Sequence, residues 1–310
     1  MKGAAHARRG AGLGPVLALA VLVLTSLGLL EYLDHTAPSR SRAGPARHTA
    51  GPRPPAGRGA AAGGARPAPA RTEGDDWEPA GEAPGRVAIV IDDVGFEEGP
   101  PLELARLGLP LTFAILPYQR HSRTLAARLR REGHEVILHL PMEPVAYPRR
   151  DPGEGAVSEG MGPAEIADAV RRDLDQVPQA VGVNNHMGSM ATADPAVMKA
   201  VLGVIKQRGL YFLDSRTSAD TVGFDMARAM GIPALERSVF LDDRREPSYI
   251  EDQVRTLLRK ARAQGSAVAI GHPDPATVEG LKRSVGLLRD GGIEVVPASE
   301  LAGRRDGGSS

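Results

Sequence analysis

Residues 86–96 read R-V-A-I-V-I-D-D-V-G-F, and this stretch decides how the rest of the chain is interpreted. Val87 to Ile91 are all aliphatic or small, a run that is short for a helix and typical of a strand buried on both faces. The run ends in two adjacent carboxylates, Asp92 and Asp93. Two neighbouring charges there are costly unless a cation, a proton or a partner offsets them. Because parallel α/β folds carry their chemistry at the carboxyl ends of strands, we expect half of a functional site here.

The composition excludes several classes of function. The chain of 310 residues has a formal net charge of zero, which gives no electrostatic basis for binding nucleic acid. It contains no cysteine, so disulfides, thiolate metal ligands and a cysteine nucleophile are excluded. The part beyond residue 85, roughly 220 residues, is long enough for one substantial α/β domain.

The first 30 residues predict a membrane anchor. Residues 1–10 carry Lys2, Arg8 and Arg9 and no acid, and residues 11–30 carry no charge. About 20 such residues suffice for one transmembrane helix. The positive flank predicts a cytoplasmic N-terminus, which places the folded domain on the periplasmic side of the cytoplasmic membrane. A cleaved signal peptide is the alternative, but its apolar core is usually about 7–15 residues long.

Composition also predicts where the folded domain begins and ends. Residues 31–85 are dominated by Ala, Gly, Pro and Arg and contain few large aliphatic side chains. Such a segment cannot bury enough apolar surface to fold, so it is expected to be a disordered linker. The folded domain is expected over residues 86–303, and residues 304–310 are expected to be a disordered tail.

One local pattern recurs through the folded domain: an amphipathic stretch ends at a glycine, and a short apolar run follows. Gly209 and Gly265 stand at such junctions, where glycine takes the left-handed conformation that closes a helix. Helix starts are also visible. Asp194 is a predicted N-cap, and Ser248 and Glu251 have the spacing of a capping box.

Repeated strand–helix units predict a parallel sheet with helices outside it. About seven or eight strands are expected to begin near Val87, Leu111, Val136, Val181, Leu210, Pro233, Ala267 and Ile293. That number over about 220 residues favours an α/β fold of the distorted or incomplete (β/α) barrel type over an open sheet. The connection over residues 142–162 is longer than an ordinary strand-to-helix turn and is expected to cover a substrate.

Polar residues follow nearly every predicted strand. They are Asp92 and Asp93, His139, Asn185 and His186, Asp214 and Arg216, Asp242 and Asp243, and His272. Parallel strands bring their carboxyl ends to one rim, so these side chains are expected to converge. Taken singly, each has an ordinary explanation: a lone histidine is more often structural, and Asp214 could simply cap a turn. Together, three histidines and two adjacent acids favour a metal site.

A carboxylate with two imidazoles suits zinc or another divalent first-row metal. Such a metal acidifies water, a second carboxylate can take the proton, and a further histidine can protonate a leaving group. These residues therefore predict metal-assisted hydrolysis, for example deacylation.

Six segments, taken in order, resemble the divergent polysaccharide deacetylase family. They are I-D-D-V-G at 91–95, H-L-P-M-E-P at 139–144, N-N-H-M-G-S at 184–189, F-L-D-S-R-T at 212–217, R-S-V-F-L-D at 237–242 and I-G-H-P at 270–273. This family is an offshoot of the carbohydrate esterases that remove N- or O-acetyl groups from chitin-like and cell-wall glycans. The resemblance implies a metal-dependent hydrolase of the cell envelope acting on an acetylated polysaccharide or a peptidoglycan-like glycan.

The resemblance also implies a role for individual residues. Asp92 resembles the catalytic base of the family, and Asp93 and His139 resemble its first two metal ligands. Better-known members have a second histidine four residues later, where this chain has Glu143. His186 would then supply the missing imidazole, with Glu143 as the reserve ligand.

The remaining roles are carried over in the same way. His272 resembles the late histidine that serves as general acid. The arginine that orients the base in better-known members has no clean equivalent, and Arg216 or Arg237 would have to replace it. Asn185 and Asp214 complete the set of expected supporting or substrate-binding residues.

Two alternative hypotheses come from other classes of protein. A non-catalytic envelope protein that keeps the fold and binds a glycan or a partner stays open, because the spacing of the site is altered. A phospho-acceptor domain also begins with a strand ending in paired acids. It would need an aspartate after the third strand, where this chain has His139, so this reading is set aside.

Overall fold

The aliphatic run after Arg86 forms a central strand of a parallel sheet, as the sequence predicts. Strand β1 (Arg86–Val94) lies between β2 (Thr112–Ile115) and β8 (Ser266–Gly271), and its side chains from Val87 to Ile91 are fully buried. The computed structural model describes residues 85–290 and 292–303.

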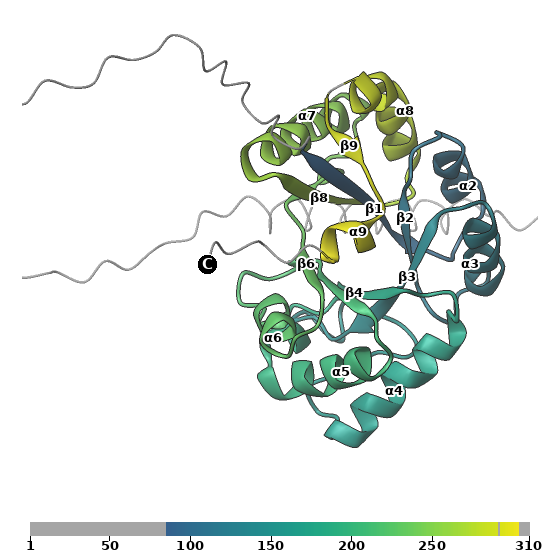
Figure 1. The fold of residues 1–310 in the computed structure, drawn as a ribbon. Coiled ribbons are helices and arrows are strands. Elements are labelled where there is room, and N and C mark those ends of the chain that lie inside the picture. Colours follow the sequence, from purple (N-terminus) through teal and green to yellow (C-terminus); the bar gives the residue numbers. More distant parts are fainter. Residues whose placement is uncertain (1–84, 291, 304–310) are drawn as a thin grey trace, which may run out of the picture. The chain divides into compact units, whose positions relative to one another are not determined.

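Helices and strands alternate along the described chain (Figure 1). The other strands are β3 (Glu135–Met142), β4 (Gly182–Met187), β5 (Tyr211–Asp214), β6 (Ala234–Glu236), β7 (Val239–Phe240) and β9 (Glu294–Val295). The α-helices are α2 (Gly99–Ala105), α3 (Ser122–Arg131), α4 (Pro163–Gln176), α5 (Pro195–Gln207), α6 (Gly223–Ala229), α7 (Pro247–Gln264), α8 (Pro275–Asp290) and α9 (Ala298–Ala302). A short 3₁₀ helix, η1 (Ala191–Ala193), precedes α5.

The sheet curls into an incomplete barrel. Neighbouring strands follow the order β6-β5-β4-β3-β2-β1-β8-β7, all pairs are parallel, and β9 pairs with the start of β1. Strands β6 and β7 stand at opposite ends of this order, yet only residues 237–238 separate them along the chain. One short segment therefore joins the two edges of the sheet, and helices surround the strands (Figure 1). The predicted distorted (β/α) barrel agrees with this architecture.

The predicted list of strand starts contains no strand corresponding to β7. This strand has only two residues, Val239 and Phe240, which are too few to produce a periodic sequence pattern. The sheet of the described residues consequently has nine strands, whereas the sequence predicted seven or eight.

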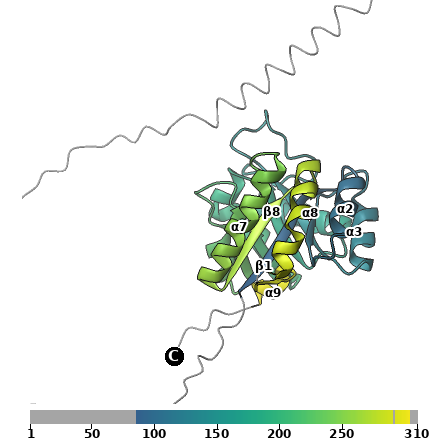
Figure 2. The same cartoon turned by 90° about the horizontal axis from the view of Figure 1, so that it is seen from above.

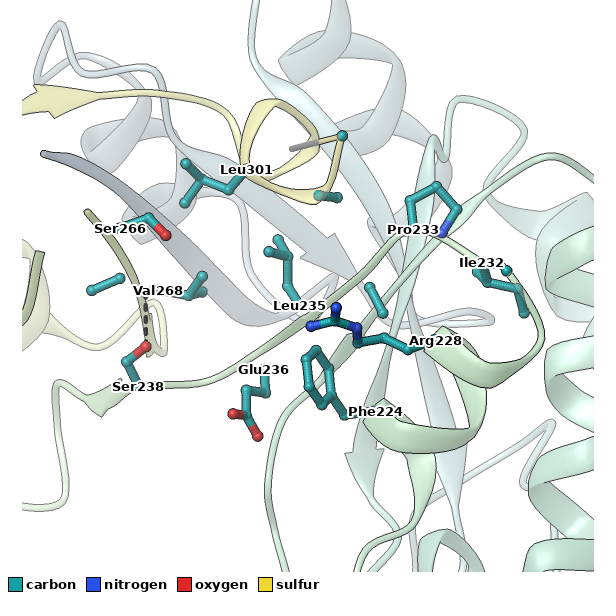
Figure 3. A pocket seen from close by; sticks show the side chains of 15 residues that line it. Phe224, Arg228, Ile232, Pro233, Leu235, Glu236, Ser238, Ser266, Val268 and Leu301 are labelled. Carbon is teal, nitrogen blue, oxygen red and sulfur yellow. Dashed lines mark hydrogen bonds between the residues drawn. The ribbon is translucent and has the colours of Figure 1, made fainter. Parts of the chain in front are cut away.

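A cavity of about 440 Å³ lies between β6 and the first residues of β8. These two strands do not pair at this point, because β6 pairs with β5, and β7 pairs with the later residues of β8. Figure 3 shows Leu235, Val268 and Leu301 around this cavity, with Phe224 and Arg228 of α6 at one side. None of the site residues predicted from the sequence lines it.

Alternate residues of β1 pack on opposite faces of the sheet, as strand geometry requires. Ala88 and Val90 belong to a cluster inside the barrel that includes Leu301 of α9, whereas Val87, Ile89 and Ile91 belong to the larger cluster under the outer helices. Figure 2 shows α9 at the end of the barrel where β1 begins. Both faces of β1 are therefore apolar, which explains its unbroken aliphatic sequence.

The predicted helix ends are partly confirmed. Asp194 caps α5, since its side chain accepts hydrogen bonds from the N–H groups of Ala196 and Val197, and Gly265 ends α7 with a left-handed φ of 79°. The predicted capping box at Ser248 is wrong. The N-cap is Glu246, two residues earlier than predicted, and helix α7 begins at Pro247, whose restricted φ already suits the first helical position.

The predicted anchor at residues 11–30, the linker up to residue 84 and the tail at 304–310 lie outside the described residues. None of the helices formed by the described residues combines the length and the apolar character that crossing a bilayer requires.

Candidate active site

The predicted catalytic and metal-binding residues converge at the carboxyl ends of the strands. Asp92, Asp93, His139, His186 and His272 all line one cavity of about 360 Å³. This volume lies within the range of about 300–1,000 Å³ that is common for small-molecule sites. Asn185 lines the same cavity, together with Pro144, Arg150, Met187, Ser189, Ser215, Thr217 and Phe240.

Adjacent residues of a regular strand point to opposite faces, yet Asp92 and Asp93 both reach this cavity. The pairing of β1 with β2 shifts register between Ile91 and Val94, and Asp93 has a φ of 54°. A left-handed aspartate is uncommon and costs of order 1 kcal/mol. The local distortion of β1 thus brings both carboxylates to one rim.

Asp93, His139 and His186 form a tight cluster of donor atoms. Oδ1 of Asp93 lies 3.1 Å from Nε2 of His139 and 2.9 Å from Nδ1 of His186, and these two nitrogens are 3.2 Å apart. Three such donor atoms lie within 4.8 Å of one another. The geometry suits one cation, because two donors that bind the same zinc ion tetrahedrally at about 2.0–2.2 Å are roughly 3–3.5 Å apart.

An unsatisfied atom supports this interpretation. Oδ1 of Asp93 is buried and has no hydrogen-bond partner among the described residues, although two imidazole nitrogens face it. A buried polar atom without a partner is rare in native proteins. The three side chains therefore fit a divalent cation that would bind to this oxygen and to the two nitrogens.

A buried amide connects the two halves of the site. Asn184 of β4 donates from Nδ2 to Oδ1 of Asp92 at 2.8 Å and to Oγ of Ser215 at 3.2 Å, and its Oδ1 lies 2.8 Å from Nδ1 of His139. Asn184 is completely buried, and Asp92 and His139 are nearly so. The second oxygen of Asp92 lies 3.6 Å from Nε2 of His139.

Burial and neighbouring charges shift the pKa values of these groups. Burial raises the pKa of Asp92 above its ordinary value, and the nearby histidines only partly oppose it. Burial would also raise the pKa of Asp93, but its contacts with His139 and His186 outweigh burial and hold the pKa well below the usual range. Burial opposes charge on His139, yet the adjacent carboxylates, Asp92 first among them, raise its pKa.

His272 stands on the other side of the cavity, after β8. Its Nδ1 lies 3.1 Å from Oδ1 of Asp242, and its Nε2 lies 3.8 Å from Oδ2 of Asp93. Burial disfavours the charged imidazole, but the hydrogen bond and the charge of Asp242 raise the pKa of His272 to about 9. His272 is consequently protonated near neutral pH and can donate a proton into the cavity.

Comparison with known proteins agrees with this arrangement of strands and side chains. The sequence model of the divergent polysaccharide deacetylase family matches residues 89–302. The chain belongs to this family. It is 37% identical to the uncharacterized protein YibQ of Escherichia coli over 217 residues, which are 70% of this chain and 67% of that protein.

Two further comparisons concern other bacteria. The deacetylase-family chain is 36% identical to an uncharacterized protein of Haemophilus influenzae over 196 residues, which are 63% of this chain and 69% of that protein. A solved structure of an uncharacterized protein from Agrobacterium tumefaciens is similar with a TM-score of 0.68 at 27% identity. The match covers 72% of this chain and 91% of that one.

Four of the predicted supporting residues of this deacetylase-family chain lie outside the cavity lining. The carboxylate of Asp214 is buried and accepts hydrogen bonds from Arg216 N, Thr221 Oγ1 and Phe224 N, so it stabilises the loop before α6. This is the turn-capping role that the sequence left open. Glu143 accepts a hydrogen bond from the N–H of Glu159 at 2.9 Å and is not part of the donor cluster.

The two arginines connect the segment after β5 to its surroundings. Arg216 pairs with Glu236 at 3.3 Å. Arg237 donates from Nε to the carbonyl oxygen of Ser215 at 2.7 Å and from Nη2 to that of Arg216 at 2.9 Å. Their contacts therefore hold the segment after β5 in place.

The sequence interpretation assigned no role to two residues that shape the site. Asn184 stands beside the chosen Asn185 in the N-N-H segment, and both side chains are buried. Asn185 lines the cavity, whereas Asn184 contacts Asp92 and His139. Asp242 stands in the sequence among the polar residues that follow predicted strands, but no role was assigned to it. The structure buries Asp242 and aligns it with His272.

Proposed function

We propose that this protein is a metal-dependent hydrolase that removes acetyl groups from an envelope polysaccharide. Asp93, His139 and His186 hold a divalent cation, most simply zinc, while Asp92 is the general base and His272 the general acid. The observation that carries the proposal is the buried Oδ1 of Asp93, which faces one imidazole nitrogen at 3.1 Å and another at 2.9 Å beside a second carboxylate.

A divalent cation in this position would polarise an acetyl carbonyl and make water more acidic. The protein's own groups then move the protons. Asp92 is suited to accept one, because burial raises its pKa and only its Oδ1 is occupied by Asn184. His272, protonated near neutral pH, is suited to donate one.

The proposed reaction is the hydrolysis of one acetyl amide or ester bond. The oxygen of one water attacks the acetyl carbon, and Asp92 takes the proton that this water loses. The bond from the carbonyl carbon to nitrogen or oxygen breaks, and His272 donates its proton to the departing amine or alcohol. Acetate and the deacetylated sugar leave, and proton exchange with solvent returns Asp92 and His272 to their starting states.

The substrate class and the location belong to the same proposal. The family points to an acetylated polysaccharide or a peptidoglycan-like glycan as the partner. The uncharged run at residues 11–30 and its basic flank support a single-pass anchor in the cytoplasmic membrane, with the catalytic domain on the periplasmic side.

Acetate release from acetylated glycans tests the proposal. The full-length parent protein, supplied with zinc, should release acetate from at least one N- or O-acetylated envelope glycan. Asp92→Asn keeps the shape but removes the base, and we expect a loss of about 10²–10⁴-fold in turnover. His272→Ala should lower turnover more than it weakens substrate binding.

Asp168→Asn is the matched control, since this exposed side chain on α4 pairs with Arg171 at the surface and does not line the cavity. It should behave like the parent protein. Unchanged turnover in both site variants would refute the proposed roles. No release by the parent from several acetylated glycans, combined with measurable glycan binding, would favour the non-catalytic binder.

A further inference from the structure

We infer that Asn184 is a positioning residue whose single amide group sets both the metal-binding tautomer of His139 and the orientation of the general base Asp92. The base-orienting half of this inference rests on the proposed function. The tautomer half concerns only the protein and a metal ion.

The orientation of the amide follows from its partners. An ionised carboxylate can only accept hydrogen bonds, so the NH₂ group of Asn184 must face Oδ1 of Asp92, 2.8 Å away. Its second N–H points to Oγ of Ser215. The carbonyl oxygen is left to face His139, and a flipped amide would place two acceptors against each other.

This orientation determines which nitrogen of His139 carries its proton. Oδ1 of Asn184 accepts a hydrogen bond from Nδ1 of His139, 2.8 Å away, so Nδ1 must hold a hydrogen. In the neutral ring the lone pair is then on Nε2, the atom that lies 3.1 Å from Asp93 and 3.2 Å from His186. A metal requires that lone pair, and hydrogen bonds to the remote nitrogen of a ligating histidine orient the ring and increase its basicity.

The same amide restrains Asp92. Because Oδ1 accepts the bond from Asn184, the carboxylate cannot rotate freely, and Oδ2 remains as the oxygen available to a reacting group. The arginine expected to orient the base binds elsewhere: the guanidinium of Arg237 holds the carbonyl oxygens of Ser215 and Arg216. Arg237 therefore supports Ser215, which in turn accepts the second bond of Asn184.

Because Asn184 is completely buried, its hydrogen bonds cannot be replaced by bonds to water. The side chains that it joins come from β1, β3 and the segment after β5, which are separated along the chain. Strands β3 and β5 flank β4 in the sheet, and β2 lies between β3 and β1. One residue thus couples the metal-binding half of the cavity to its proton-accepting half.

Two substitutions separate the two roles. Asn184→Asp keeps an acceptor for Nδ1 of His139 but replaces the donor to Asp92 by a second carboxylate. We expect zinc affinity, measured by competition with a chelator, to stay within about threefold, while kcat falls about 10–100-fold at a similar KM. Asn184→Leu removes both bonds, and we expect zinc affinity itself to fall about 10–100-fold.

A spectroscopic measurement tests the tautomer without any substrate. In protein labelled with ¹⁵N-histidine, the zinc-loaded parent and Asn184→Asp should show a protected Nδ1–H resonance for His139, and Asn184→Leu should lack it. If the Leu variant does not fold, the Nδ1–H resonance of the zinc-loaded parent still tests the tautomer, and kcat of Asn184→Asp still tests the orientation of Asp92. The control Ile205→Val lowers stability in the outer core, remote from the cavity, and should alter neither zinc affinity nor the resonance.

The inference is overturned if Asn184→Asp and Asn184→Leu weaken zinc binding equally, or if the zinc-loaded parent lacks a proton on Nδ1 of His139. It is also overturned if kcat of an active parent is unchanged in Asn184→Asp. A parent that releases no acetate would refute the proposed function, whereas zinc affinity and the Nδ1–H resonance would still decide the role of Asn184 toward His139.

Discussion

Asp242 holds His272 at two points. Its Oδ2 accepts the backbone N–H of His272 at 2.6 Å, and its Oδ1 lies 3.1 Å from Nδ1 of the imidazole. Thr277 donates to the same Oδ2 at 2.9 Å. Because Asp242 occupies Nδ1, the Nε2 edge of the ring is the one that faces Asp93 across the cavity. The imidazole is therefore oriented as a proton donor should be.

Removing the charge of Asp242 should change the pH dependence of the reaction. A general acid works only while protonated, so activity of the parent should fall as pH rises through the His272 pKa of about 9. Asp242→Asn loses the carboxylate that raises this pKa, so the falling limb should move to lower pH, and maximal turnover should drop roughly tenfold. The profile of acetate release against pH measures both effects.

The neighbouring Asp243→Asn is the control, because this side chain is exposed. It should leave the alkaline limb where the parent has it. An alkaline limb that is unchanged in Asp242→Asn would contradict the assignment of His272 as the acid.

The choice of His186 over Glu143 as a metal ligand is open to a direct test. His186→Ala removes one of three clustered donors, so we expect zinc affinity to fall by at least about tenfold. Glu143→Gln alters a side chain that binds the N–H of Glu159, and its zinc affinity should match that of the parent. Metal analysis of the purified proteins, followed by chelator competition, distinguishes the two. The opposite ranking would show that the metal binds on the Glu143 side.

Much of the fold could be predicted because local patterns and packing agree. The aliphatic run of β1 is buried on both faces, so its sequence shows no alternation and indicates a central parallel strand. Asp194 and Gly265 mark helix ends by local chemistry alone. By contrast, nothing local to Val239 and Phe240 indicates β7, because that strand exists only through its pairing with β8.

The residues of the candidate site that stand at the carboxyl ends of strands could be predicted from the sequence. Asp92, His139 and His272 each follow an apolar run, and parallel topology brings them together. The distortion of β1 adds Asp93 to the same cavity. The roles of Asn184 and Asp242 depend on which side chain meets which across neighbouring strands. That information is tertiary: register places Asn184 beside His139, and no spacing in the sequence reports it.

The membrane topology remains a prediction from residues 1–30, and a fusion experiment can check it. A reporter that is active only in the periplasm, joined after Ser310, should be active and should remain in the membrane fraction. Deleting residues 11–30 should leave it inactive in the cytoplasm. Replacing Lys2, Arg8 and Arg9 by glutamate should reduce periplasmic activity, because these charges set the orientation. Recovery of the intact parent fusion from the soluble cytosolic fraction would contradict the anchor.

A buried acid outside the active site should control how stability depends on pH. Asp173 of α4 is completely buried, and its carboxylate lies beside the hydroxyl group of Tyr118. It lies under the connection between β3 and α4, where a Cβ added to Gly155 would collide with its Oδ1. Burial raises the pKa of Asp173 from 3.8 to about 7.

The direction in which stability changes with pH follows from the difference in proton binding between the folded and unfolded states. A carboxyl whose pKa is higher in the folded state favours folding while it is protonated, so its contribution is complete below about pH 3.8. That contribution is lost as pH rises toward 7. At about 1.4 kcal/mol for each pKa unit, and allowing for local relaxation, the loss should be about 2–4 kcal/mol. Asp173→Asn keeps the shape without the charge, so at pH 8 it should be more stable than the parent by that amount, with little difference near pH 4.

Urea unfolding at several pH values measures this difference, and Asp175→Asn provides the control on the same helix. Asp175 is exposed and pairs with Arg208 at 3.4 Å, so its substitution should change the free energy of unfolding by less than about 0.5 kcal/mol at any pH. If the stability of Asp173→Asn follows the parent curve between pH 4 and 8, the charge of Asp173 is compensated in the folded protein. If only Asp173→Asn removes the dependence of the unfolding free energy on pH, ionisation of Asp173 destabilises the folded protein. The destabilised region is then the connection between β3 and α4, beside the candidate active site.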